Sequence, residues 1–155
     1  MRNFHCICRN AVYAVLLLFF PATAPVFSAQ ETDRMAGRLA SCPDSPNCVS
    51  SDAANPTHHI PPLAISLPAN EAWRLISESV KEMPRTKIVD ISDNYLHAEC
   101  TSLVFRFVDD LQIELRVGGV IAVRSASRTG HRDFGVNRRR VEQLREMLRA
   151  KGVIK

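Results

Sequence analysis

The feature that most constrains the fold is a series of short apolar-polar runs that follow one another between residues 87 and 128. They read KIVDIS, YLHAECTS, LVFRFVDD, LQIELRV and VIAVRSASR, and short turns such as Asp93-Asn94 and Gly118-Gly119 separate them. Successive side chains of a strand point to opposite faces of a sheet, so this alternation predicts half-buried strands. Links this short cannot form the long crossover that parallel pairing requires. The sequence therefore predicts an antiparallel meander, with LAISL at 63–67 as a further strand.

Two segments have the spacing of amphipathic helices. In residues 70–83 apolar side chains recur at i, i+3, i+4 and i+7, with Asn70 as the expected cap and Pro84 as the stop. Residues 136–152 repeat this pattern and end at Gly152. The predicted fold class is α+β: a single domain with an antiparallel sheet of about five or six strands and two main helices packed on one side.

The first 29 residues have the three parts of a secretory signal peptide. Arg2 and Arg9 accompany an uncharged apolar run, AVYAVLLLFF, and small residues and prolines follow in PATAPVFSAQ. The run is shorter than the ~20 residues that a spanning helix needs. We expect cleavage near Ser28 or Ala29, which leaves residues 30–155 as one periplasmic or secreted domain. An uncleaved membrane anchor is the alternative.

The charge of the chain is nearly balanced once the predicted signal peptide is removed. The full chain has a net charge of +4, and without Arg2 and Arg9 there are 18 basic residues against 16 acidic ones, which leaves +2. Proteins that bind nucleic acid carry a strongly basic surface, so we expect no nucleic acid partner. The arginines matter through their clustering in 124–140.

Three cysteines remain in the predicted mature chain. Cys42 and Cys48 bracket the turn-rich loop CPDSPNC, which favours a disulfide in an oxidising compartment. Two free thiols are one alternative. A metal site with His58 and His59 is the other, but the spacing matches no standard zinc pattern and we expect no metal. Cys100 lies in an alternating apolar run and is expected to be a buried core residue.

The turn between the last two predicted strands decides which charged residues face each other. A two-residue loop at Gly118-Gly119 mixes apolar and charged residues on both faces, which a half-buried sheet disfavours. A three-residue loop at 118–120 gives one apolar face. It also places Glu114 opposite Arg124 and Asp110 opposite Arg128, pairs that contribute about 0.2–1 kcal/mol each. These arginines either form a solvent-facing row of ion pairs, or the acids hold their guanidinium groups in position to bind a ligand anion.

Three arginines stand where the last helix is expected to begin. If Asn137 is the cap, Arg138, Arg139 and Arg140 occupy the first turn, where the helix dipole disfavours positive charge. One structural explanation is an earlier start with Asp133 as the cap. Another is ion pairing across the fold with one of the carboxylates Asp109, Asp110 or Asp133.

The functional explanation of the cluster is an anion site. Free backbone N–H groups at the helix start and the surrounding guanidinium groups would bind one anion together. Ser125, Ser127 and Asn137 would add neutral donors, and Gly130 and Gly135 would let the backbone come close. The ligand would be an anionic small molecule or a lipid headgroup, bound by an exported domain with peripheral envelope association. No cofactor is expected.

Two further functions are compatible with the sequence. A small hydrolase would use His131 and Asp133, although no nucleophile stands in a recognisable elbow and no pair has a diagnostic catalytic spacing. A structural or interaction protein without a ligand would use the same residues for folding alone.

Three motifs together resemble a known family. They are CPxSPNCVSS at 42–51, FxFxDD at 105–110 and RSxSRxGxxDFGxNRxR at 124–140. The chain resembles the bacterial and plastid family called domain of unknown function 1499, over about Leu39 to Leu148. The resemblance implies that the domain looks like a complete member of this family, with its motif-bearing core at 39–148. It implies no particular reaction or substrate. With the motif residues included, the predicted ligand-binding set is Arg124, Ser125, Ser127, Arg128, Asp133, Asn137 and Arg138.

Overall fold

The computed structural model describes residues 39–155, and the predicted signal peptide lies outside the described residues. The elements are β1 (Cys48–Ser50), β2 (Leu63–Ala64), α2 (Ala69–Glu82), β3 (Thr86–Ile91), β4 (Tyr95–Thr101), β5 (Val108–Arg116), β6 (Val120–Ser127) and α3 (Val136–Ala150). The strands form one sheet in the order β1-β6-β5-β4-β3, and β2 also pairs with β6. All these pairings are antiparallel, as the short links predict.

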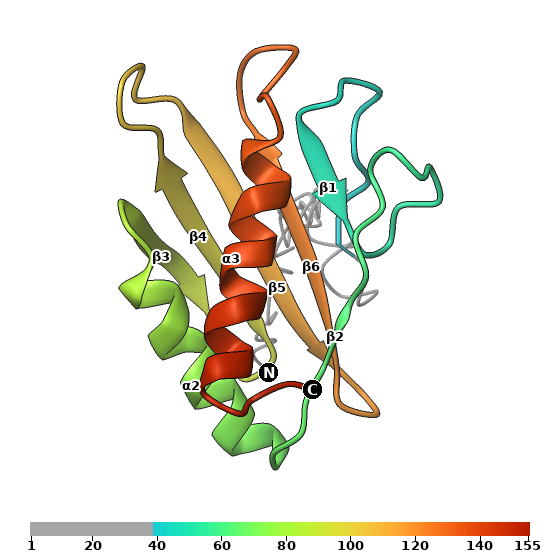
Figure 1. Ribbon diagram of the computed structural model, residues 1–155, viewed down its shortest axis with the longest axis vertical. Helices are drawn as coiled ribbons and strands as arrows, with labels where there is room; N and C mark the ends of the chain where they lie inside the picture. Colours follow the sequence, from blue (N-terminus) through green and yellow to red (C-terminus); the bar gives the residue numbers. More distant parts are fainter. Residues whose placement is uncertain (1–38) are drawn as a thin grey trace, which may run out of the picture.

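Both helices lie on the same face of the sheet (Figure 1). The alternation in β4 and β5 turns every second side chain toward the helices, and Leu96, Leu111 and Ile113 are fully buried there. Ile76 of α2 and Leu144 of α3 are buried from the other side. Cys100 is buried in this core, as expected, and burial raises the pKa of its thiol. These layers confirm the predicted α+β class.

The hairpin between β5 and β6 differs from the predicted register. Arg116 pairs with Val120, so the three-residue loop is 117–119 and not 118–120. Gly118 and Gly119 have φ values of 84° and 75°, which glycine adopts without a steric cost. The carbonyl of Gly119 accepts the N–H of Ile65, next to β2, at 2.9 Å, and this contact fixes the turn.

The shift changes the expected charge pairs. Glu114 faces Ala122 instead of Arg124, which lies opposite Gln112. The predicted apolar face survives because a shift of two residues leaves every side chain on its own face.

The predicted strand run at 103–110 is only partly a strand. β4 ends at Thr101, β5 begins at Val108, and residues 102–107 form a loop. The N–H of Ser102 bonds the carbonyl of Phe107 at 2.8 Å, and the N–H of Phe107 bonds the Ser102 hydroxyl at 2.9 Å. The apolar residues between them have no strand partner, so they project outward.

Both helix starts also differ from expectation. α2 begins at Ala69 after Pro68, which makes no side-chain cap bond, so Asn70 lies within the first turn. α3 begins at Val136, one residue before the predicted cap Asn137. Within residues 39–155, neither helix is long and apolar enough to cross a membrane.

Candidate functional site

The residues of the three motifs meet at one end of the sheet. β4 and β6 end there, β1 and β5 begin there, and α3 starts beside them (Figure 1). We call this region the loop end and define it as residues 43–47, 102–107 and 128–135. Its inner side is a buried polar network, and its outer side carries exposed apolar side chains.

Asn137 is the centre of the buried network and is fully buried. Its side-chain amide donates to the carbonyl of Asn47 at 2.9 Å and to the hydroxyl of Ser127 at 3.0 Å. Its oxygen accepts the hydroxyl of Ser125 at 2.6 Å, and Ser125 is buried as well. Asn47 in turn donates to the carbonyl of Gly130 at 2.6 Å. One amide side chain therefore connects β6, α3, the loop after β6 and the segment before β1.

Arg140 completes the network with a buried ion pair. Its guanidinium group bonds the carboxylate of Asp109, and the two side chains are 10% and 6% exposed. It also donates to the Ser125 hydroxyl at 2.9 Å and to the oxygen of Asn137. A buried cation needs a paired anion and further hydrogen bonds, and this arrangement supplies both. One of the three arginines is thus explained by pairing across the fold with Asp109.

The carboxylate of Asp133 bonds the start of α3, whose N-cap residue is Gly135. One carboxylate oxygen accepts the N–H of Gly135 at 2.9 Å, and the other accepts the N–H of Asn137 at 2.8 Å. A carboxylate at this place satisfies free backbone donors and complements the helix dipole. The helix therefore starts earlier than a cap at Asn137 predicts, but its cap is Gly135 and not the predicted Asp133. Asp133 still places a negative charge ahead of the arginines.

The remaining predicted arginines also have protein partners. Arg138 donates to the carbonyls of His59 at 2.9 Å and Thr57 at 3.0 Å. Arg128 bonds the carboxylates of Asp110 and Glu99, each at 2.7 Å. The Asp110–Arg128 pair thus forms, although the register differs from the one predicted.

Arg124 has a weaker set of contacts. Its Nη1 donates to the side-chain oxygen of Gln112 at 3.1 Å, while its Nε is buried without a hydrogen-bond partner. Burial lowers the pKa of Arg124, and the Coulombic attraction of Asp110 opposes this. Burial favours a higher pKa for Asp110, but hydrogen bonds from Arg128 and His97 outweigh it and keep that pKa below its usual value.

These contacts bear on the predicted ligand-binding set. Ser125 and Asn137 are enclosed, and Asp133, Arg128 and Arg138 bind protein groups. A role for these residues with a ligand stays a prediction, and each of them has a structural partner. The spacing could not reveal Asn47, because it reaches the network from 90 residues away in sequence.

The outer side of the loop end exposes large apolar side chains. In the loop before β5, Leu103, Val104 and Phe105 are 72%, 75% and 74% exposed, and Phe107 is 52% exposed. The rings of Phe105 and Phe107 stack with centroids 5.6 Å apart. In the loop before α3, Phe134 is 89% exposed on a backbone with a φ of 52°.

Exposed basic residues adjoin these apolar residues in sequence. Arg106 lies between the two stacked phenylalanines in sequence, and His131 and Arg132 precede Phe134. None of the three makes a side-chain hydrogen bond or an ion pair within the described part of the chain. The acids nearby in sequence are occupied, since Asp109 pairs with Arg140 and Asp133 accepts N–H groups at the start of α3. Asp44 is an exposed acid on the third segment of the loop end, residues 43–47.

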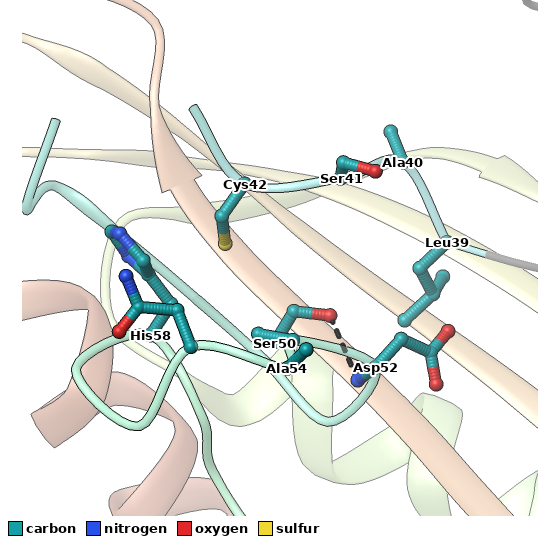
Figure 2. A pocket seen from close by; sticks show the side chains of 10 residues that line it. Leu39, Ala40, Ser41, Cys42, Ser50, Asp52, Ala54 and His58 are labelled. Carbon is teal, nitrogen blue, oxygen red and sulfur yellow. Dashed lines mark hydrogen bonds between the residues drawn. The ribbon is translucent and has the colours of Figure 1, made fainter. Parts of the chain in front are cut away.

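A separate pocket lies beside β1 and has a volume of about 380 Å³. Figure 2 shows Ser50 between His58 and Asp52, with Cys42 above and Leu39 beside Asp52. Cys42 forms the predicted disulfide with Cys48, with Cα atoms 5.6 Å apart. The disulfide removes the thiolates that a metal site would need. In the described range, no group of three or more His, Cys, Asp and Glu side chains is placed to hold a metal ion.

Comparison with known families agrees with the motif resemblance. The family described as "Protein of unknown function (DUF1499)" matches residues 38–148. The chain belongs to this family. No curated protein matches the chain. All three family motifs contribute to the buried network, through Asn47, Asp109 and Asn137, so much of the family pattern is explained by the folding of the loop end.

Proposed function

We propose that this DUF1499 member is an exported domain that docks on an anionic lipid surface through the outer side of its loop end. The observation that carries the proposal is the set of exposed apolar side chains on two loops at the same end of the sheet (Figure 1), with unpaired arginines on the same loops. Soluble proteins seldom expose contiguous apolar side chains without a binding role. The export step follows from the predicted signal peptide and is part of the proposal.

The apolar side chains suit the membrane interface. Phe105 and Phe134 are 74% and 89% exposed, and both are on loops that project beyond the sheet (Figure 1). Transfer of a large apolar side chain out of water contributes about 1.5–3 kcal/mol when burial is complete. The buried network holds the backbone behind Phe134 in place, so little ordering is needed when this side chain leaves water.

The charges favour an anionic surface over a neutral one. Arg106 and Arg132 are exposed and without an acidic partner among residues 39–155. Each basic residue near an anionic leaflet contributes about 1 kcal/mol to binding. This proposal retains the lipid headgroup expected from the sequence, but it assigns recognition to Arg106 and Arg132 instead of the arginines that bond protein groups.

The hydrolase alternative has no geometric support of its own. Both carboxylate oxygens of Asp133 accept backbone N–H groups of α3. In the described residues no hydrogen bond joins His131 to Asp133. The two residues do not form the oriented acid-base pair that nucleophile activation requires.

Vesicle cosedimentation tests the proposal with the processed protein recovered from the secretory route. Phosphatidylglycerol vesicles are compared with phosphatidylcholine vesicles. We expect binding to the anionic vesicles, reduced about tenfold or more by the pair Phe105→Ser and Phe134→Ser. The pair Arg106→Ser and Arg132→Ser should reduce it about 30-fold, since two contributions of about 1 kcal/mol are lost.

Ile91→Ser with Lys81→Ser is the matched control. Ile91 is 49% exposed and Lys81 is an exposed base, and neither belongs to the loop end. The control pair should bind like the wild type. Equal binding to both kinds of vesicle, or equal binding by all three variants, would contradict the proposal.

A further inference from the structure

The pocket beside β1 contains two buried side chains whose hydrogen-bonding groups are used only in part by the described residues. They are Ser50 and His58, which are 1% and 5% exposed. The pocket volume of about 380 Å³ lies within the range of about 300–1,000 Å³ that is usual for small-molecule sites. The residues that line the pocket are distinct from those of the loop end.

His58 presents an unused acceptor. Its Nδ1 lies 2.9 Å from the carbonyl oxygen of Cys48, and a carbonyl can only accept, so Nδ1 carries the proton. The neutral ring then has its lone pair on Nε2. No side chain or backbone group of residues 39–155 bonds this nitrogen. The imidazole is thus held in one tautomer, with a free acceptor.

Ser50 presents an unused donor. Its hydroxyl oxygen accepts the N–H of Asp52 at 3.2 Å, but its proton has no acceptor among the described residues. Leaving a buried donor unpaired costs about 1–3 kcal/mol, so such a group usually meets a ligand or ordered water. Ser50 also belongs to the CPxSPNCVSS motif, but it takes no part in the buried network around Asn137.

The charge of the pocket argues against an anion. Asp52 is the acid in its wall, and Arg116 binds its two carboxylate oxygens at 2.7 and 2.6 Å. No lysine or arginine is among the described residues that line the pocket. The wall also contains Leu39 and Ala54, which offer apolar contact. The pocket therefore combines a donor, an acceptor and apolar surface, with its one acid neutralised.

We propose that this pocket binds a neutral, hydroxyl-rich ligand of the size of a single sugar unit. One ligand hydroxyl donates to Nε2 of His58, and another accepts the hydroxyl proton of Ser50. Hydroxyl groups suit both positions because each can donate and accept. The C–H groups of the ring pack on Leu39 and Ala54.

An NMR titration of the ¹⁵N-labelled processed protein, without lipid, tests this proposal. The probes are glucose, N-acetylglucosamine and myo-inositol, with sodium phosphate and sodium acetate as anionic probes. Each is added up to about 50 mM, so that binding as weak as a millimolar Kd, about −4 kcal/mol, is detected. We expect at least one neutral probe to shift the backbone amides of Ser50, Asn55 and His58, and the anions to leave them unchanged. Ser50→Ala should weaken binding about 2- to 10-fold, the usual effect of one hydrogen bond.

Ser77→Ala is the matched control, because Ser77 is an exposed serine on α2 that bonds a carbonyl of its own helix. It should bind the probe like the wild type. His58→Phe replaces the imidazole with an apolar aromatic ring, which removes Nε2 together with the Nδ1 bond to the Cys48 carbonyl. It should abolish the shifts while the rest of the spectrum remains that of a folded protein. Three results would overturn the proposal: no shift with any neutral probe, stronger shifts with phosphate or acetate, or unchanged binding by Ser50→Ala. The first result would leave water as the occupant of the pocket.

Discussion

Asp109 and Asp110 are adjacent carboxylates whose environments differ because β5 turns them to opposite faces of the sheet. The side chain of Asp109 points toward α3, where it is 6% exposed and pairs with Arg140. The side chain of Asp110 lies on the face without helices, is 21% exposed and pairs with Arg128, itself 42% exposed. Solvent screens the second pair much more than the first. Neighbouring acids of one motif therefore have different energetic roles.

We predict that Asp109→Ala lowers the free energy of unfolding by about 3–5 kcal/mol, because it leaves the cation of Arg140 buried without its partner. Asp110→Ala should lower it by less than about 1 kcal/mol, because Arg128 is exposed to water. Urea denaturation followed by circular dichroism measures both values. Similar losses in the two variants would show that the Asp109–Arg140 pair is not buried in solution.

At the scale of elements, the sequence predicts the layers better than the connections. The alternation in β4 and β5 and the helical spacing of α2 and α3 report which side chains face the core, and the structure confirms those faces. The predicted position of the hairpin loop is wrong because the contact that fixes it, from Ile65 to Gly119, comes from the segment at β2, which is distant in sequence. Local patterning contains no information about such a contact.

The loops of the candidate site also could not be predicted from local sequence patterns. Residues 103–107 have the composition of a strand, and only the end of β4 at Thr101 shows that they must form a connection. The sequence leaves two explanations of the arginines open, an earlier helix start with Asp133 as the cap and ion pairing across the fold. Each holds in part, because α3 starts earlier but with Gly135 as its cap, and Arg140 pairs with Asp109.

The contact between β2 and the hairpin makes a prediction about two adjacent glycines. Both have positive φ, but a Cβ atom on Gly118 would meet nothing within 4 Å, whereas one on Gly119 would lie 2.9 Å from a side-chain carbon of Ile65. Gly118→Ala should therefore cost only the left-handed strain of about 1–2 kcal/mol. Gly119→Ala should cost about 1 kcal/mol more, because overpacking adds to the strain. Thermal unfolding of the two variants measures the difference, and equal melting temperatures would contradict it.

For the molecule as a whole, the Cys42–Cys48 disulfide stands between the two regions to which we assign functions. Cys42 lines the pocket beside β1, and Asn47, inside the closed loop, bonds the loop after β6 and the side chain of Asn137. The bridge therefore limits the freedom of the pocket wall and of the segment that supports the loop end. Opening it should affect both regions together.

We predict that Cys42→Ser with Cys48→Ser lowers the free energy of unfolding by about 2 kcal/mol, the loop-closure entropy of so short a ring. The loss should be unevenly distributed: hydrogen exchange should accelerate at the backbone amide of Ser127, which bonds the carbonyl of Asn47, and stay slow in the centre of β5. A dithiol reductant should produce the same changes in the wild type and none in the double variant, which separates the disulfide from other effects of the reductant. Acceleration confined to residues 42–48 would mean that the loop end holds its shape without the bridge, and that the pocket and the loop end are independent of each other.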